Sequence, residues 1–352
     1  MTTYSKHRFH VLDGMRGIAA ICVMLYHYKL FGGSRIAWLH NGFMSVDFFF
    51  VLSGFVVLHA YGKKLLTGMA ATDYLARRVA RLFPFMALGL LIGLPFVSVE
   101  PGHYATYDLI NSTFLNLLFV PYLGHQNPAY GFPADLPLWS ISFEMAASVA
   151  FIWLARLSFR VTAGLMVACL ALFVFSAVLT AKLCHGYLGV GPYEPTFLGG
   201  FPRVGFGFLL GMLLYRWQET RAPVPAVHPV WLYVALICML AFPFSLDGAY
   251  YFIAAITLSP LLVHFGAQAK TGGAMEKASE FLGWLSYPLY CLHLPVLNGM
   301  KMAAQHHLIS HPNVLAVPVS LALAGGAAAT YDKLGLQRKV TSLLYPGQPV
   351  RA

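Results

Sequence analysis

Long apolar runs separated by short polar segments dominate the chain. About ten of these runs are candidate membrane spans, because roughly 20 apolar residues suffice for a helix to cross a bilayer. They cover approximately residues 11–30, 42–61, 83–99, 137–157, 162–181, 198–216, 230–246, 249–267, 281–301 and 313–332. The pattern predicts an all-α, polytopic integral membrane protein. An even number of spans places both termini on one side of the membrane.

Composition supports a membrane protein. Of the 352 residues, 58% are hydrophobic and only 10% are charged, against about 25% charged in an ordinary soluble domain. The net charge of +10 would suit a nucleic-acid partner, but the Lys and Arg residues lie in short loops between apolar runs. We therefore expect the lipid bilayer as a partner and no nucleic acid. The sequence indicates no oligomeric state.

The basic residues also predict an orientation, because cytoplasmic loops are enriched in Lys and Arg. With the N-terminus in the cytoplasm, 18 of the 23 basic residues fall on the inner side. The loop 62–82 is then internal and the loop 100–136 external. The segment 111–122 in the external loop is apolar but too short to cross, so we expect it to be re-entrant or interfacial.

Cysteine and histidine spacing gives no sign of a metal. The chain has five cysteines and no CxxC pair, so neither a disulfide framework nor a zinc site is predicted. Three histidines, His306, His307 and His311, fall in one predicted outer loop without ligand spacing and are expected to be solvated. Asp13 and Arg16 interrupt the first apolar run, which we interpret as a retained span rather than a signal peptide.

The first span carries an arginine and a histidine on one helical face. Arg16 and His27 are eleven positions apart, which is close to three turns and roughly 16 Å of helix. Ionisable groups inside a span are costly and mark function by default. The alternative is a snorkelling arginine and a hydrogen-bonded core histidine. Asp13, near Arg16, is a candidate for orienting polar partners.

The second span contains Asp47 and Ser53, for which a structural role is the favoured interpretation. Asp47 would form an interhelical ion pair with Lys29 or Arg35. Ser53, followed by Gly54, would allow another helix to pack closely.

The predicted inner loop ends in three arginines: Arg77, Arg78 and Arg81. Arg78 and Arg81 are one helical turn apart and are expected to project from one face beside the membrane. They are either ordinary inner-side anchors that contact anionic lipid or a forked cationic clamp for a phosphate-bearing cytoplasmic ligand.

The fourth span begins with Trp139 in PLWSISFE and places Glu144 roughly 8 to 10 Å below its outer end. An acid at this depth needs a partner, and Arg203 and His27 are the candidates. Glu144 either forms a structural ion pair or orients a catalytic histidine.

The ninth span has a polar face in an apolar helix. Ser286, Tyr290 and His293 share that face by their offsets of four and seven. We expect the face to point into the bundle, either as interhelical hydrogen bonds around a proline kink or as the wall of a polar cavity.

These segments together resemble the membrane-bound acyltransferase-3 family, which includes O-antigen and exopolysaccharide O-acetylases. The resemblance covers nearly the whole chain, which is therefore expected to be one acyltransferase domain over 1–352 without a fused soluble domain. The motifs occur in order as LDGMRGIAA with the Arg16 and His27 spacing, VDFFFVLSGF, RRVARLFP, PLWSISFE, FPRVGFGFLLGMLL and LSYPLYCLHLP. Two positions depart from the family pattern. The residues after Glu144 lack the usual aromatic pair, and Asp332 is followed by Lys333 without a proline.

The resemblance implies an acyl-CoA donor, expected to be acetyl-CoA, and a hydroxyl acceptor on a cell-surface or exported glycan. It also implies a bacterial cytoplasmic membrane and no metal. In that chemistry His27 is the general base, Arg16 and Glu144 complete the catalytic set, and Arg77, Arg78 and Arg81 bind the anionic donor. Acylation of a small molecule or a lipid-linked acceptor remains an alternative. A secondary transporter is an alternative of another class, although no matching inverted halves are visible.

Overall fold

The computed structural model describes residues 8–32, 39, 41–98, 105–123, 131–183, 189–192, 194–222, 226–242, 248–336, 339–340 and 342. All regular structure in these residues is helical. The long helices are α1 (His10–Gly32), α2 (Ser45–Leu66), α3 (Ala71–Ser98), α5 (Leu138–Leu154), α6 (Phe159–Leu183), α7 (Gly200–Glu219), α8 (Pro229–Ala241), α11 (Gly273–Gln305) and α12 (Pro312–Lys333). Shorter segments are η1 (Gly42–Met44), α4 (Thr106–Leu117), η2 (Glu194–Gly199), α9 (Ala249–Ile253), the π-helical η3 (Ala254–Leu258) and α10 (Ser259–Gln268).

Each of the ten predicted spans coincides with a helical segment, and α9, η3 and α10 together form the eighth. By length and hydropathy alone, six segments in the described part of the chain could cross a membrane: Gly42–Leu66, Ala71–Ser98, Phe159–Lys182, Thr196–Glu219, Ala249–Gln268 and Val314–Lys333. The helices α5 and α8 are apolar but shorter. The protein is therefore a polytopic, all-α membrane protein, as predicted.

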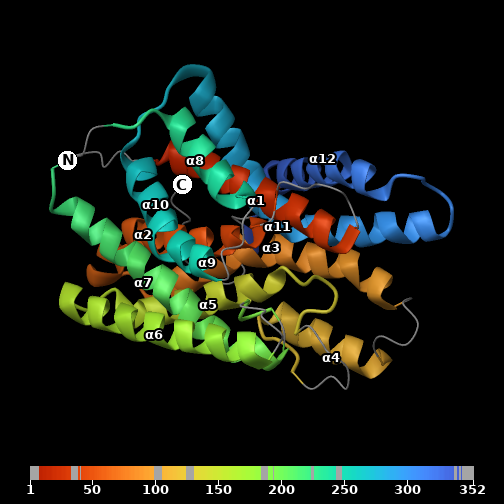
Figure 1. Ribbon diagram of the computed structural model, residues 1–352, viewed down its shortest axis with the longest axis horizontal. Coiled ribbons are helices and arrows are strands. Elements are labelled where there is room, and N and C mark those ends of the chain that lie inside the picture. Colours follow the sequence, from red (N-terminus) through yellow and green to blue (C-terminus); the bar gives the residue numbers. More distant parts are fainter. Residues whose placement is uncertain are drawn as a thin grey trace.

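Helices α1 and α11 lie side by side at the centre of the bundle (Figure 1), and α1 packs more extensively on α11 than on any other helix. They run in the same direction, because Gly14 approaches Ser279 and Gly17 approaches Leu282. Small residues bring the two backbones together: a Cβ at Gly17 would lie 2.5 Å from the Leu282 carbonyl oxygen, and one at Gly283 would lie 2.7 Å from Asp13 Cβ. This contact places the polar faces of both helices against each other.

A second close contact joins α2 to α7. A Cβ at Gly54 would collide with the backbone carbonyl of Phe208, and a Cβ at Gly211 would collide with that of Val51. Gly54 of the second span therefore serves close helix packing, as predicted, whereas Ser53 donates to Glu144. Helix α6 packs on the other side of α7, and α12 packs on α11 at the opposite edge (Figure 1).

Two boundaries differ from the sequence prediction. Helix α3 begins at Ala71 and continues through Pro84, so the basic segment predicted as part of a loop over 62–82 is mostly helical. Charge does not break a helix, and the turn between α2 and α3 needs only a few residues. The predicted outer loop 100–136 contains α4, in which Tyr107, Ile110 and Phe114 are exposed and Leu109 is buried.

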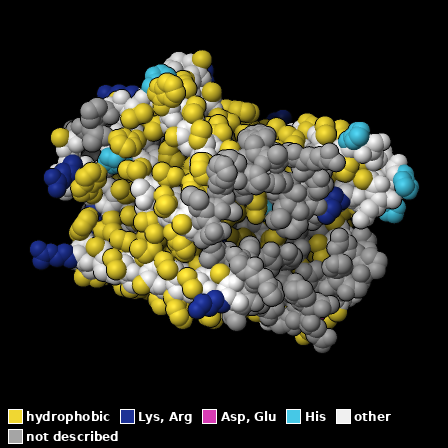
Figure 2. Space-filling view, viewed as in Figure 1, with side chains coloured by type: hydrophobic (Ala, Val, Ile, Leu, Met, Phe, Trp, Pro, Cys, Tyr) yellow, Lys and Arg dark blue, Asp and Glu magenta, His cyan; other side chains and the backbone are white. Residues whose placement is uncertain are grey.

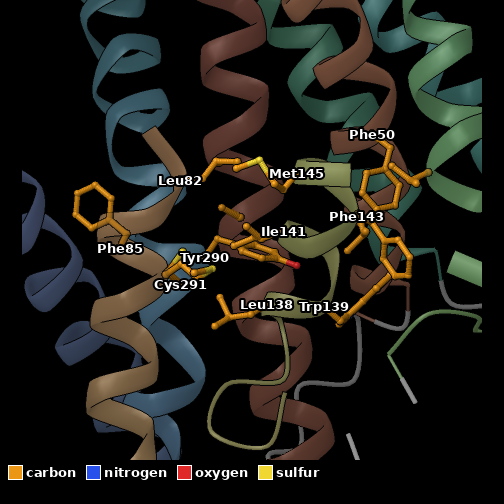
Figure 3. Close-up of a cluster of buried hydrophobic side chains, with 14 of the residues drawn as sticks. Phe50, Leu82, Phe85, Leu138, Trp139, Ile141, Phe143, Met145, Tyr290 and Cys291 are labelled. Carbon is orange, nitrogen blue, oxygen red and sulfur yellow. The ribbon is translucent and has the colours of Figure 1, made fainter. Parts of the chain in front are cut away.

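The core between α2, α3, α5 and α11 is apolar and aromatic. Figure 3 shows α5 side chains from Leu138 to Met145 between Phe50 of α2, Leu82 of α3 and Tyr290 of α11. Outside the grey regions, hydrophobic side chains cover most of the face seen in Figure 2, and the visible Lys and Arg side chains lie mainly near its margins. This surface suits contact with lipid.

Candidate active site

Arg16 is held at the beginning of the α1 and α11 pair. Its Nε donates to Ser286 Oγ at 2.9 Å, and an NH2 group donates to the Gly283 carbonyl at 2.7 Å. Asp13 lies 3.3 Å away on the same helix and also pairs with Arg8. The Arg16 side chain keeps 26% of its surface exposed, so it is anchored but still open to a ligand.

His27 contacts a second histidine, His293 of α11. The Nδ1 atom of His27 lies 2.8 Å from Nε2 of His293, and the two rings lie edge to edge, with centroids 5.0 Å apart and planes inclined by 14°. His293 is fully buried, and its Nδ1 lies 3.1 Å from the Leu289 carbonyl oxygen. The shared polar face of Ser286, Tyr290 and His293 does point into the bundle, because all three are buried. Ser286 accepts a hydrogen bond from Arg16, and His293 contacts His27. The Tyr290 hydroxyl lies 2.6 Å from Ser140 Oγ.

Glu144 pairs with Arg78, which corrects the predicted partners Arg203 and His27. An NH2 group of Arg78 donates to Glu144 Oε1 at 2.5 Å, and Ser53 Oγ donates to the same oxygen at 3.2 Å. The Nε of Arg78 donates to Ser148 Oγ at 3.0 Å. Arg78 reaches Glu144 because α3 lies beside α5 in the bundle. Spacing along the sequence does not indicate which helices are neighbours, so this pair was not predicted.

Asp47 pairs with Arg203, and this too differs from the predicted partners Lys29 and Arg35. The guanidinium binds both carboxylate oxygens, at 2.8 and 2.7 Å, and donates to the Val190 carbonyl at 3.0 Å. The rings of Trp139 and Tyr251 lie 5.3 and 5.6 Å from Arg203 Cζ. Arg35 and the side chain of Lys29 fall outside the described residues. The pair is buried and bidentate, which fits the predicted structural role of Asp47.

A cavity of about 770 Å³, open space at its mouth included, lies between Arg16 and the Arg78 and Glu144 pair. Its polar lining comes from α1, α2, α3, α5 and α11: Arg16, Ser53, Arg78, Arg81, Ser140, Glu144, Ser286, Tyr287 and Tyr290. The apolar part of the wall consists of Val46, Phe49, Phe50, Leu52, Val56, Val57, Leu82 and Ile141. Among the described residues His27 does not line it, but Tyr290 on its wall packs edge-on against His293 at 6.0 Å.

The three arginines of the predicted clamp have different environments. Arg78 is only 2% exposed and is occupied by Glu144 and Ser148, so it does not project freely as predicted. Arg81 is exposed, lines the cavity and has no hydrogen-bond partner among the described side chains. Arg77 is half-buried, does not line the cavity, and has a buried Nε without a partner in the described part of the chain.

Several residues of the site were not singled out from the sequence. Ser140 and Ser148 lie one turn before and after Glu144 on α5, so the three form a polar stripe at intervals of four residues. That stripe is the signal that could have identified them. Tyr287 lines the cavity although it lies off the predicted face of α11, and no spacing signal identifies it.

Four further histidines of the described residues bear on metal binding. His306, His307 and His311 are exposed, as predicted. One described group, His10 with Glu276 and Glu280, brings three possible ligand atoms within 4.8 Å of one another. However, Arg8 donates to Glu280 at 3.0 Å, and this cation already compensates the acidic charge.

Comparison with known proteins identifies the family. The family described as Acyltransferase domain, Acyl_transf_3, matches residues 9–331. The chain belongs to the acyltransferase-3 family. The resemblance inferred from the motifs is therefore confirmed, and the family is one of membrane acyltransferases rather than transporters.

Individual relatives extend this result. The Bacillus subtilis protein named putative peptidoglycan O-acetyltransferase YrhL is 26% identical over 81% of this chain and 48% of its own length. Peptidoglycan O-acetyltransferase OatA of Listeria monocytogenes is 26% identical over 89% of this chain and 53% of its own length. Protein 2 in picA locus of Rhizobium radiobacter is 33% identical over 46% of this chain and 91% of its own length. The chain thus spans about half the length of the Bacillus subtilis and Listeria monocytogenes relatives. No solved structure matches it.

Proposed function

We propose that this acyltransferase moves an acetyl group from acetyl-CoA, bound from the cytoplasmic side, to a hydroxyl of a cell-surface or exported glycan. The names of relatives that acetylate peptidoglycan support the glycan acceptor. The asymmetry of the basic residues supports entry of the donor from the side on which α1 and α11 begin. We place the protein in the bacterial cytoplasmic membrane on the same grounds.

The observation that carries the proposal is the cavity. Two cations, Arg16 and Arg81, face it from α1 and α3, and its wall ends at Tyr290, next to the His27 and His293 pair. Coenzyme A is anionic at its nucleotide end, and guanidinium groups suit phosphate. The apolar wall suits the uncharged acyl arm.

The chemistry then follows from the positions of the side chains. Arg16 and Arg81 hold the donor, and Arg78 and Glu144 fix the cavity wall between them. His27 takes the proton of the acceptor hydroxyl as the hydroxyl oxygen attacks the thioester carbonyl. The C–S bond breaks, and the leaving thiolate receives that proton from His27. The products are an O-acetyl ester and free coenzyme A.

A direct test uses inverted membrane vesicles that contain the protein. [14C]Acetyl-CoA is supplied to the exposed cytoplasmic face, and the glycan fraction is treated with mild alkali, which cleaves esters but not amides. We expect alkali-labile label in the glycan fraction only when the protein is present. Binding of acetyl-CoA without labelled glycan would redirect the search to lipid or small-molecule acceptors, and failure to bind acetyl-CoA would overturn the proposal.

The role of His27 is tested by His27→Gln, which keeps a hydrogen-bonding side chain but removes the imidazole base. We expect transfer to fall by about 10²–10⁴ while the affinity for acetyl-CoA, measured by titration calorimetry, is retained. His311→Gln, an exposed histidine outside the site, is the matched control and should transfer normally. If folded His27→Gln transfers at the wild-type rate, His27 is structural and the base lies elsewhere, with Glu144 and His293 next to be tested.

A further inference from the structure

We infer that His293 is a positioning residue that holds His27 in the tautomer with its proton on Nδ1, leaving Nε2 as the basic nitrogen. The inference rests on the proposed function for its catalytic meaning, but the tautomer itself can be measured without activity. The fully buried ring of His293 makes two contacts: one nitrogen lies next to a backbone carbonyl, and the other lies next to His27.

The carbonyl fixes the direction of the whole chain of hydrogen bonds. A carbonyl oxygen can only accept, so the 3.1 Å contact with Leu289 O requires a proton on His293 Nδ1. In a neutral ring the other nitrogen, Nε2, is then an acceptor. His27 Nδ1 lies 2.8 Å from that acceptor and must therefore carry its own proton. A neutral His27 with a proton on Nδ1 has its lone pair on Nε2.

The argument needs a neutral His293, and its surroundings favour that form. The ring has no exposed surface, and in the described part of the chain no carboxylate hydrogen-bonds it. Burying a charge without a partner is expensive. A cationic His293 would donate to His27 Nδ1 instead and reverse the tautomer, so the two charge states make opposite predictions.

The neighbouring contacts fix the geometry as well as the proton. The two imidazole planes are inclined by only 14°. The Tyr28 hydroxyl, next along α1, bonds Ser320 of α12 and lies 3.3 Å from the carbonyl oxygen of His293. The backbones on both sides of the histidine pair are thus held together, and rotation of the His27 ring would break its bond to His293.

This arrangement also serves the reaction. When His27 Nε2 takes the proton of the acceptor hydroxyl, the ring becomes cationic and its Nδ1–H still donates to His293. A hydrogen bond from a charged donor is about twice as strong as a neutral one, so the contact strengthens as charge develops. His293 itself neither gains nor loses a proton, and the proton on Nε2 passes to the leaving thiolate.

The first experiment reads the tautomer by nitrogen NMR of protein labelled with [15N]histidine, since a ring nitrogen without a proton resonates far from one that carries it. Subtracting the spectrum of His27→Gln assigns the His27 signals. We expect wild-type His27 to be protonated on Nδ1, and His293→Leu to shift it toward the Nε2-protonated form. A wild-type His27 protonated on Nε2 would overturn the inference whatever the protein catalyses.

The second experiment separates positioning from packing by kinetics. In His293→Leu the acceptor is lost, and we expect kcat to fall on the order of 10²-fold with little change in the KM for acetyl-CoA. In His293→Gln the side-chain oxygen can accept from His27 Nδ1–H, so activity should return to within about tenfold of wild type. Leu297→Ala, fully buried one turn further along α11, is the control for a packing defect and should leave the tautomer unchanged.

The outcomes distinguish the inference from the proposed function. If wild-type protein transfers no acetyl group but His27 has its proton on Nδ1, the function fails and the tautomer stands. If the protein transfers acetyl and folded His293→Leu keeps the wild-type kcat, the positioning role fails and the function stands. If His293→Leu does not fold, the wild-type spectrum still tests the tautomer, and the kcat of His293→Gln still tests the positioning role.

Discussion

Arg78 and Arg81 lie one turn apart on α3, yet their side chains have different surroundings. Arg78 is buried against Glu144 and Ser148, whereas Arg81 is exposed and faces the cavity. A buried charge that loses its partner is strongly destabilising, while an exposed cation is free to bind a ligand. Removing Arg81 should therefore affect ligand binding, whereas removing Arg78 should affect stability.

We predict that Arg81→Ala weakens binding of acetyl-CoA about tenfold, since a hydrogen bond to a charged group contributes about 1.5 kcal/mol or more, while the melting temperature stays unchanged. Arg78→Ala should instead lower the free energy of unfolding by about 3 kcal/mol, because Glu144 loses its cation. Calorimetric titration and thermal unfolding in detergent measure both effects. Arg160→Ala, an exposed arginine on α6 outside the cavity, is the control. Unchanged acetyl-CoA affinity in Arg81→Ala would make Arg81 an anchor for the inner membrane surface.

Sequence reasoning found the polar residues of the site better than it found their partners. Offsets of four and seven correctly placed Ser286, Tyr290 and His293 on one buried face, because helical periodicity is a local property. The partners of Asp47 and Glu144 were predicted wrongly, because an interhelical pair depends on which helices are neighbours. That order is set by packing across the whole bundle.

At the scale of the helices, close contacts between small residues determine which helices can be neighbours. Helix α2 meets α7 at Gly54 and Gly211, where any side chain would meet the opposing backbone. Rigid backbone cannot yield as a flexible side chain can, so these contacts tolerate no added volume.

We predict that Gly211→Ala lowers the free energy of unfolding by about 1–3 kcal/mol, because its Cβ would collide with the Val51 carbonyl. Gly164→Ala on α6 is the matched control, since a Cβ there meets nothing within 4 Å. Thermal unfolding of both variants in the same detergent makes the comparison. Equal stability of the two variants would show that α2 and α7 can separate at no cost.

The sequence predicted the ends of apolar segments, and these do not always coincide with the ends of helices. The apolar part of α3 was identified, but its first twelve residues were assigned to a loop because they are basic. The helix also continues through Pro84. Conversely, the exposed apolar residues of α4 confirm that a short apolar segment need not be buried in protein.

For the whole molecule, the basic residues predict that the loop between α11 and α12 is external and that the loop between α10 and α11 is cytoplasmic. In a variant without native cysteines, a cysteine at His306 should react with an impermeant maleimide added to intact cells, and one at Lys270 should not. Both positions are exposed, so burial cannot explain a difference. The opposite labelling pattern would reverse the orientation and place the arginine end of the cavity outside.

The spacing of charge along α1 and α11 has a consequence for membrane energetics. Between Arg16 and His27 on α1, and between Ser286 and His293 on α11, no residue carries a formal charge. An acetyl group is neutral, whereas the phosphates of its carrier would stay with the arginines at one end. Passage of the acyl group along this helix pair would move no net charge through the electric field. Such a transfer needs no work against the transmembrane voltage and should proceed equally in energised and de-energised membranes.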